Sequence, residues 1–365
     1  MLGYLAACGG ATTTSNVQDA ATPDAAAPDA MPPIDAGPPP QQGTPPAKPP
    51  APPTADTSTK TFAIQTLYLG ESPRGGGAPS SQAWKKYGYN LDGKVTQALS
   101  ADVCTRAQGA PSSNQADGDL GIDNAFGAVF LPILQAATST NEPSKQASVQ
   151  YQTGKRTQQI QIKGLSDDTT QTAIGLGGGV FTSLDYKGDS SVAVPFPGFA
   201  PTTDWPVRVE GLLDGSTIAG GPKIAFGQAY VSGGTFVANQ LDFAISMPFQ
   251  GEDLPLLIHH AVVTFDHSAP GAAANGTIAG VLDTEELIVQ MKAMAGRIST
   301  TLCGSQFDGI AQQIRQASDI MVALTNVAGI KCNGISIGLG FEGVLLANPT
   351  KIAKAPLPVL PNPCP

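Results

Sequence analysis

The densest cluster of oxygen ligands in the sequence is Asp117-Gly118-Asp119-Leu120-Gly121-Ile122-Asp123-Asn124. Carboxylate and amide oxygens spaced around glycines can wrap a hard cation, so Ca²⁺ is the candidate cofactor, with Asp117, Asp119, Asp123 and Asn124 as ligands. The segment lacks the turn glycine and the final glutamate of an EF-hand. The competing interpretation is structural: Asp123 or Asn124 caps a short helix whose apolar side chains face inward, namely Phe126, Val129, Phe130 and Ile133.

Gly334-Ile335-Ser336-Ile337-Gly338 matches the G-x-S-x-G pattern of hydrolases. A nucleophile elbow needs a strand, a sharp turn and then a helix. Here the apolar alternation continues through Leu339 and Phe341, which predicts one uninterrupted strand. We therefore assign no catalytic residue to this segment.

Histidines and paired acids are the other groups able to do chemistry. His259 and His267 are predicted on one face of a strand, about 26 Å apart, too far to share a metal ion. We interpret His259 as a hydrogen-bonded sheet residue. Asp167-Asp168, Glu252-Asp253 and Glu285-Glu286 could include glycosidase carboxylates. We favour solvated or helix-start positions for them.

Trp84 and Trp205 are the aromatic residues best suited to stack on a sugar; the competing interpretation is that both pack in the core or against loops. The chain carries 20 Lys and Arg against 29 Asp and Glu, a net charge of −9, which argues against nucleic-acid binding. Charged residues make up only 13% of the chain. A surface rich in Ser, Thr, Gln and Gly suits a glycan, polymer or protein partner.

Leu5-Ala6-Ala7-Cys8 is similar to the lipobox of bacterial lipoproteins, whose signal peptide is removed before the acylated cysteine. Residues 1–7 would be a residual signal peptide. Residues 8–57 are almost wholly Ala, Pro, Asp, Thr and Gln, which predicts a disordered, lipid-anchored linker. Gly9 follows the cysteine, so we expect the outer membrane or cell surface, with the membrane as a partner through the anchor.

Four further cysteines, Cys104, Cys303, Cys332 and Cys364, fit two disulfides in an oxidising envelope. Three pairings are open. We predict Cys303–Cys332, which brackets a helical segment, together with Cys104–Cys364. A zinc site is the weaker alternative, since no two cysteines have C-x-x-C spacing.

These residues must be positioned by a β-rich body over residues 58–365, read as a single domain. Short alternating segments bounded by Gly, Asp and Pro predict an antiparallel β-sandwich-like body. Asp283 is expected to cap a first helix, followed by a second over Phe307–Leu324; this C-terminal pair would pack on the sheet. The predicted strands are Thr61–Leu69, Gln158–Lys163, Gly179–Tyr186, Val192–Pro197, Val207–Leu213, Ile224–Val231, Thr235–Phe249, Leu256–Phe265, Ile278–Leu282 and Gly334–Ala347.

Four short motifs together resemble uncharacterised lipoproteins of myxobacterial type. They are an NLDG segment (Asn90–Gly93), Cys104, a DG-x-x-GIDN loop (Asp117–Asn124) and a Cys-x-x-Ile-Ser strand from Cys332. The resemblance implies location in the outer membrane and no known activity. The sequence therefore favours a non-enzymatic, lipid-anchored envelope protein with a binding or structural role. A hydrolase acting on envelope or extracellular polymers is the alternative.

Overall fold

The computed structural model describes residues 43–50, 56–138, 142–155, 158–186, 195–249, 252–267, 269–353 and 361–364. Residues 40–365 form one compact unit. Residues 1–39 make up the other unit; they lie outside the described residues, as do Cys8 and most of the expected linker. The predicted strand Val192–Pro197 also lies largely outside them.

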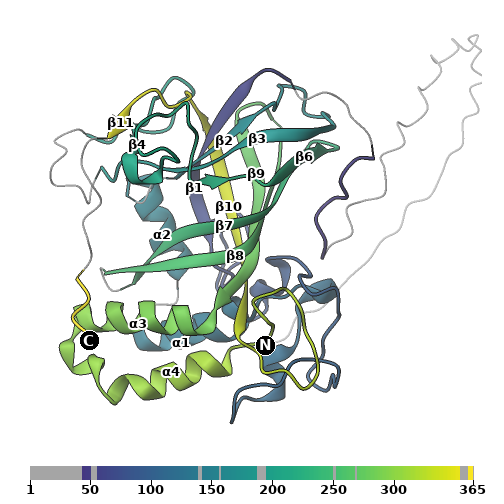
Figure 1. The fold of residues 1–365 in the computed structure, drawn as a ribbon, viewed down its shortest axis with the longest axis vertical. Helices are drawn as coiled ribbons and strands as arrows, with labels where there is room; N and C mark the ends of the chain where they lie inside the picture. The colour runs from purple at the N-terminus through teal and green to yellow at the C-terminus, as the bar shows by residue number, and fades with distance from the viewer. Residues whose placement is uncertain are drawn as a thin grey trace, which may run out of the picture. The chain divides into compact units, whose positions relative to one another are not determined.

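A nine-stranded sheet dominates the compact unit, in the order β2-β1-β10-β9-β8-β7-β6-β3-β5 (Figure 1). The mainly β, antiparallel class is thereby confirmed. A two-sheet sandwich is not confirmed, because β2 pairs with β1 along one edge and with β3 along the other, which closes the large sheet on itself. The strands are β1 (Thr59–Tyr68), β2 (Gln158–Lys163), β3 (Ala173–Thr182), β5 (Ile224–Ala225), β6 (Gln228–Ser232), β7 (Thr235–Phe249), β8 (Glu252–Asp266), β9 (Ala272–Asp283) and β10 (Gly334–Leu346).

Alternation along the strands decides which side chains enter the core. On β7, Leu241, Phe243 and Ile245 are buried, whereas Asp242 and Ala244 between them are exposed, as the sequence predicts. Outside the large sheet, two short parallel strands, β4 (Val207–Arg208) and β11 (Ile352–Ala353), pair with each other. The strand predicted over Val207–Leu213 is thus much shorter, because a 3₁₀ turn begins at Val209.

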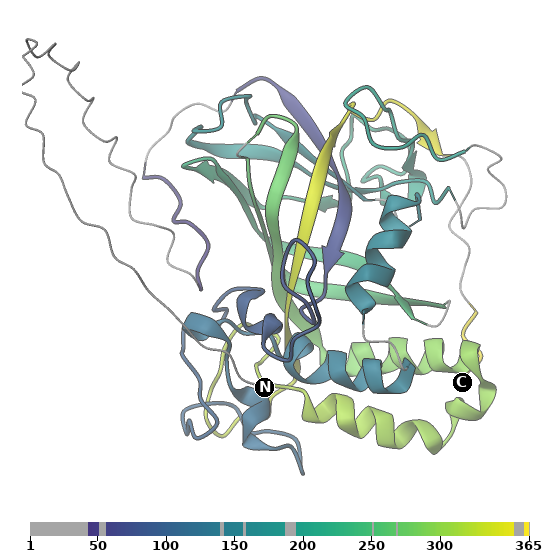
Figure 2. The same ribbon diagram turned by 180° about the vertical axis from the view of Figure 1, so that it is seen from behind.

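Helix α2 (Pro143–Gln152), which the sequence pattern did not predict, covers the second half of β1 (Figure 2). Strand β2 pairs with β1 only from Thr59 to Ala63. Beyond that point, the N–H groups of Leu67 and Leu69 donate to the hydroxyl groups of Ser148 and Ser144, at 3.1 and 2.7 Å. Serines on a helix therefore satisfy strand donors that a neighbouring strand would otherwise accept.

Helices α3 (Thr284–Ile298) and α4 (Gln306–Gln316) follow β9. Asp283 caps α3 as predicted, accepting from the N–H groups of Glu285 and Glu286. The second helix is shorter than predicted: it ends at Gln316, because Ile320 forms a bridge with Gly334 at the start of β10. Leu287 and Met291 of α3 and Ile314 of α4 belong to the same buried apolar cluster as the interior of the sheet.

Four cysteines form two disulfides, but not in the predicted pairing. Cys104 is bonded to Cys332, and Cys303 to Cys364. The prediction failed because Thr105 pairs with Lys331 in a parallel bridge, which brings the segments of Cys104 and Cys332 together. None of the helices in the described ranges combines the length and apolar character needed to cross a bilayer.

Residues 43–50, which the sequence assigns to the linker, contact the body. The carbonyl of Gly43 accepts from the Asn90 N–H at 2.6 Å, and that of Pro46 accepts from the Tyr230 hydroxyl at 2.6 Å. The proline-rich chain thus lies against β6 and the NLDG segment.

Candidate binding groove

A groove of about 470 Å³ lies between the segment that carries Trp84 and the helical region that follows the DG-x-x-GIDN loop. We call it the Trp84 groove. Its volume is in the range of small-ligand sites. Trp84 belongs to a short 3₁₀ helix, Ala83–Lys86, and is partly exposed. The groove is lined by Gly70, Glu71, Pro79, Ser80, Ser81, Trp84, Gly127, Ala128, Leu131, Pro132 and Gln135.

The groove is lined by both apolar and polar residues. Trp84 and Leu131 offer apolar contact, while Ser80, Ser81 and Gln135 offer polar groups. The indole N–H of Trp84 donates to the Ser81 carbonyl at 3.0 Å, which fixes the ring in place. The ammonium group of Lys85 lies 5.8 Å from the Trp84 ring centroid. An aromatic face with hydroxyl groups near it matches the amphipathic faces of a sugar ring.

Asn124 holds both sides of the groove together. Its side-chain N–H₂ donates to the carbonyls of Trp84 and Tyr87, each at 3.2 Å. Its Oδ1 accepts from the N–H of Gly127 at 3.0 Å, the contact expected of a helix cap, and from that of Gly338 at 3.1 Å. Because the amide is used by backbone groups, we interpret Asn124 as a positioning residue for Trp84.

Small residues allow the helical region to approach Trp84 closely. A Cβ on Gly127 would lie 2.7 Å from the Trp84 Cβ and 3.0 Å from the Asn124 Nδ2. A larger residue at position 127 would therefore force Trp84 or the helical region to shift. Gly127 lies in a π-helical turn (Phe126–Phe130) that is continued by α1 (Leu131–Thr138). Phe126 and Phe130 are buried, as predicted for this helix.

A second hollow, of about 380 Å³, adjoins the groove and shares Glu71 and Pro79 with it. Glu71 is 7% exposed. Its two carboxylate oxygens accept from the N–H and the hydroxyl of Ser144, at 2.7 and 2.5 Å. Glu71 thus caps the N-terminus of α2, where a carboxylate is favoured by the helix dipole. Glu142 also lines this hollow and is exposed.

The four expected calcium ligands differ in their surroundings. The carboxyl groups of Asp117 and Asp123 are hydrogen-bonding neighbours, whereas Asp119 is exposed and Asn124 is used as described above. Burial raises the pKa of Asp117 to about 7, with a further contribution from the charge of Asp92. Burial also raises the pKa of Asp123. Within the described ranges, no group of three or more His, Cys, Asp or Glu side chains is arranged to hold a metal ion.

Asp123 joins the DG-x-x-GIDN loop to the NLDG segment, and Asp117 joins it to Thr96 just beyond that segment. Asp123 accepts from the Leu91 N–H at 2.6 Å, and Asp117 accepts from the Thr96 N–H at 2.5 Å. The two motifs named in the resemblance therefore form one hydrogen-bonded unit, which supports Asn124 and, through it, the groove.

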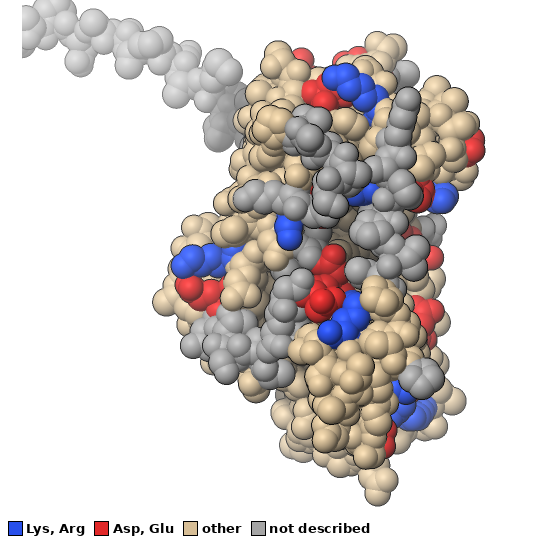
Figure 3. Space-filling model, turned by 90° about the vertical axis from the view of Figure 1, so that its left-hand side faces the viewer, with Lys and Arg blue, Asp and Glu red and all other residues tan. Residues whose placement is uncertain are grey.

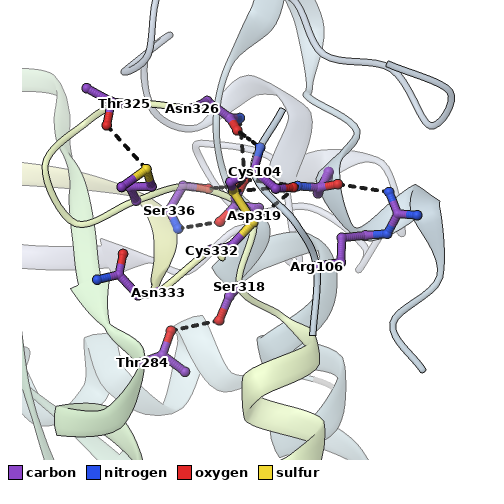
Figure 4. Close-up of a disulfide and its surroundings, with 12 residues drawn as sticks. Cys104, Arg106, Thr284, Ser318, Asp319, Thr325, Asn326, Cys332, Asn333 and Ser336 are labelled. Carbon is purple, nitrogen blue, oxygen red and sulfur yellow. Dashed lines mark hydrogen bonds between the residues drawn. A yellow bond between two sulfur atoms is a disulfide. The ribbon is translucent and has the colours of Figure 1, made fainter. Parts of the chain in front are cut away.

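Ser336 lies within β10, so the strand predicted through the G-x-S-x-G segment is confirmed. Its hydroxyl hydrogen-bonds to Asp319 at 2.5 Å and accepts from the Ala125 N–H at 2.8 Å. Figure 4 shows Asp319 and Ser336 beside the Cys104–Cys332 disulfide. Burial raises the pKa of Asp319 to about 7. The Cys-x-x-Ile-Ser strand thus supports the start of the helical region that forms one wall of the groove.

Trp205, the other residue expected to stack on a sugar, is fully buried. It packs against Phe199, with ring centroids 5.1 Å apart, and against Tyr186 and Phe196. Its indole N–H donates to the Gly198 carbonyl at 3.2 Å. Trp205 is therefore a core residue in this structure, and stacking on a ligand would depend on Trp84.

The prediction that His259 and His267 share a strand face is wrong. His260 between them has a positive φ of 51°, and the pairing of β8 with β9 shifts register after His259. This irregularity resets the alternation, so His259 lies on the outer side and His267 is fully buried. His259 is hydrogen-bonded, as expected, to Asp242 and Glu286.

Acidic and basic side chains are interspersed on the face shown in Figure 3, and much of its described surface is uncharged. Sequence reasoning did not find Asn124 as the residue that positions Trp84, or the glycine contact beneath it. The feature of the sequence that could have indicated this role is a capping residue, Asn124, three positions before Gly127. Searches of protein-family models, curated proteins and solved structures found no match to this chain.

Proposed function

We propose that this protein is a lipid-anchored component of the bacterial cell envelope that binds a glycan in the Trp84 groove. The observation that carries the proposal is the groove itself. It contains the partly exposed Trp84, whose main-chain carbonyl is bound by Asn124 and whose indole N–H is bound by the Ser81 carbonyl, together with apolar and hydroxyl-bearing residues. Sugar rings bind by placing an apolar face on an aromatic ring while their hydroxyl groups bond to polar neighbours.

The anchor rests on the lipobox-like Leu5-Ala6-Ala7-Cys8 and on the long proline-rich segment after it. The two disulfides fit an oxidising envelope. A mass spectrum of the N-terminal peptide from the native source tests this part. An acylated Cys8 as the first residue supports the anchor and the outer-membrane location, and an unmodified cysteine contradicts both.

Binding is favoured over hydrolysis because of the role of Glu71, the acidic residue among the described residues that line the groove. Glu71 uses both carboxylate oxygens to cap α2, which makes it a poor general acid or base. Glycoside hydrolysis uses two carboxyl groups roughly 5–10 Å apart that face the substrate.

A glycan array probed with the wild-type protein and two variants tests the binding site. We expect Trp84→Ala to lose binding and Lys145→Ala, an exposed neighbour of the adjoining hollow, to retain it. Loss of one aromatic stacking contact should weaken binding by about 1 kcal/mol or more, at least fivefold. Equal binding by wild type and Trp84→Ala would contradict the proposed site. Shortened glycans recovered after incubation would favour the hydrolase alternative.

A further inference from the structure

A second groove, of about 630 Å³, runs between the outer side of β7 and β8 and the first half of α3. We call it the α3 groove. In Figure 1, α3 lies below β8. Its walls are apolar: Leu257 is 40% exposed and Val289 is 61% exposed, with Ala244 and Pro255 beside them. Large aliphatic side chains this exposed, lining a hollow of this size, are typical of a ligand site.

One end of the α3 groove is charged. Ala244 and Leu257 are paired across β7 and β8. Asp242 and His259 lie two residues further along their strands, and therefore on the same outer side. There the His259 ring contacts two carboxylates: its Nδ1 lies 3.2 Å from Asp242 Oδ1 and its Nε2 lies 3.1 Å from Glu286 Oε2.

The number of N–H donors that the two carboxylates need shows that a cation suits the charged end of the α3 groove. A neutral imidazole has a single N–H and can donate to only one of the two carboxylates. Both contacts are satisfied when His259 is an imidazolium ion. The groups facing it are Asp242 from β7 and Glu286 from α3, while its partner on β9, Val281, is uncharged. The histidine thus acts as a resident cation between two acids.

Among the described residues that line the groove, the charged ones are acidic, namely Asp283, Glu285 and Glu286. Asp283 caps α3, and Glu285 is paired with Arg315 at 2.7 Å. In the described part of the chain, the side chains of Glu286 and Asp242 form their ion pairs with His259, and they lose this positive neighbour when the ring is neutral.

We propose that the α3 groove binds an amphiphilic cation, with an alkyl chain along Leu257 and Val289 and an amine between Asp242 and Glu286. This site is separate from the Trp84 groove and does not depend on the proposed function. His259 in its imidazolium form competes with the amine for the same carboxylates. Affinity for the amine therefore rises as pH increases and His259 becomes neutral. The same two carboxylates hold the pKa of His259 above its ordinary value, against the effect of burial.

Isothermal titration of the purified protein with octylamine, octanol and octanoate tests the proposal. The three probes share one chain and differ in head group. At pH 8.5 we expect octylamine to bind about tenfold more tightly than octanoate, the effect of about 1.4 kcal/mol of charge interaction. Octylamine is protonated at both pH 5.5 and pH 8.5, so its weaker binding at pH 5.5 would report His259.

Variants test the part of the groove that would bind the head group separately from the part that would bind the alkyl chain. Glu286→Gln should remove most of the preference for the amine, and His259→Gln should make affinity for octylamine independent of pH. Asp242→Asn provides a second test of the head-group end. Glu142→Gln, at the other hollow, is the matched control for the acidic net charge and should behave as wild type. Equal affinity for all three probes, no binding, or a pH dependence that persists in His259→Gln would overturn the proposal.

Discussion

Asp319 offers the sharpest test of how the groove is supported, because it is a buried acid with a defined partner. Its Oδ1 accepts from the Ser336 N–H at 2.8 Å, and its Oδ2 bonds to the Ser336 hydroxyl at 2.5 Å. We predict that Asp319→Asn reduces the dependence of stability on pH. The asparagine keeps the acceptor for Ser336 N–H and stays neutral at every pH.

The magnitude follows from the pKa of Asp319, which burial raises to about 7 from its ordinary value of 3.8. Between these two values, the folded state holds a proton that the unfolded chain has released. The free energy of unfolding therefore falls as pH rises, by about 1.4 kcal/mol per pH unit for one proton. From pH 5 to pH 8 the loss amounts to about 2–3 kcal/mol, since the slope flattens above pH 7.

Urea unfolding of the wild-type protein and Asp319→Asn at pH 5, 6, 7 and 8, with disulfides intact, measures this effect. The variant should lack about 2–3 kcal/mol of the wild-type decline, while Asp117, whose pKa is also about 7, supports the remaining decline. Asp119→Asn, which changes an exposed acid nearby, should leave the decline unchanged. An Asp319→Asn variant with the full wild-type decline would refute the reasoning.

Three further predictions concern the scaffold. Gly338→Ala should lower the free energy of unfolding by about 1–3 kcal/mol, because its Cβ would lie 2.2 Å from the Tyr87 carbonyl oxygen. The control Gly304→Ala, whose Cβ would meet open space, should leave it unchanged. Equal urea midpoints for the two variants would contradict this prediction. A non-reducing peptide map should show Cys104–Cys332 and Cys303–Cys364; a Cys303–Cys332 peptide would contradict the structure. EDTA should leave the melting temperature unchanged, because the Asn124 amide is used by backbone groups and Asp119 is exposed; a fall of several degrees would favour the calcium hypothesis.

Local patterns predicted the elements that depend on local rules. The β2 bounds, the alternation along β7, the Asp283 cap and the strand through Ser336 all follow from side-chain period or capping chemistry. Helix α2 was not predicted, and two of its buried residues are the polar Ser144 and Ser148. Their hydroxyl groups accept hydrogen bonds from N–H groups of β1, which is distant in sequence, so the local sequence pattern does not indicate the helix.

Closure of the sheet and the disulfide pairing depend on long-range register. Strand β2 pairs on both edges, and nothing in its six residues distinguishes this from membership of an open sheet. The candidate site likewise depends partly on residue type and partly on contacts between distant segments. Trp84 could be named from its residue type, whereas Trp205 could not be assigned to the core without its neighbours Tyr186 and Phe199.

Fluorescence offers the most direct test of the central claim that Trp84 contacts a glycan. The chain has two tryptophans, and Trp205 is fully buried, so a bound ligand in the groove should change the emission of Trp84 alone. Titration of the wild-type protein with soluble oligosaccharides from bacterial envelope polysaccharide should give a saturable spectral shift and protection from acrylamide quenching. Trp84→Phe, which keeps Trp205, should show neither. A saturable shift that persists in Trp84→Phe, or no shift in the wild-type protein, would contradict the account.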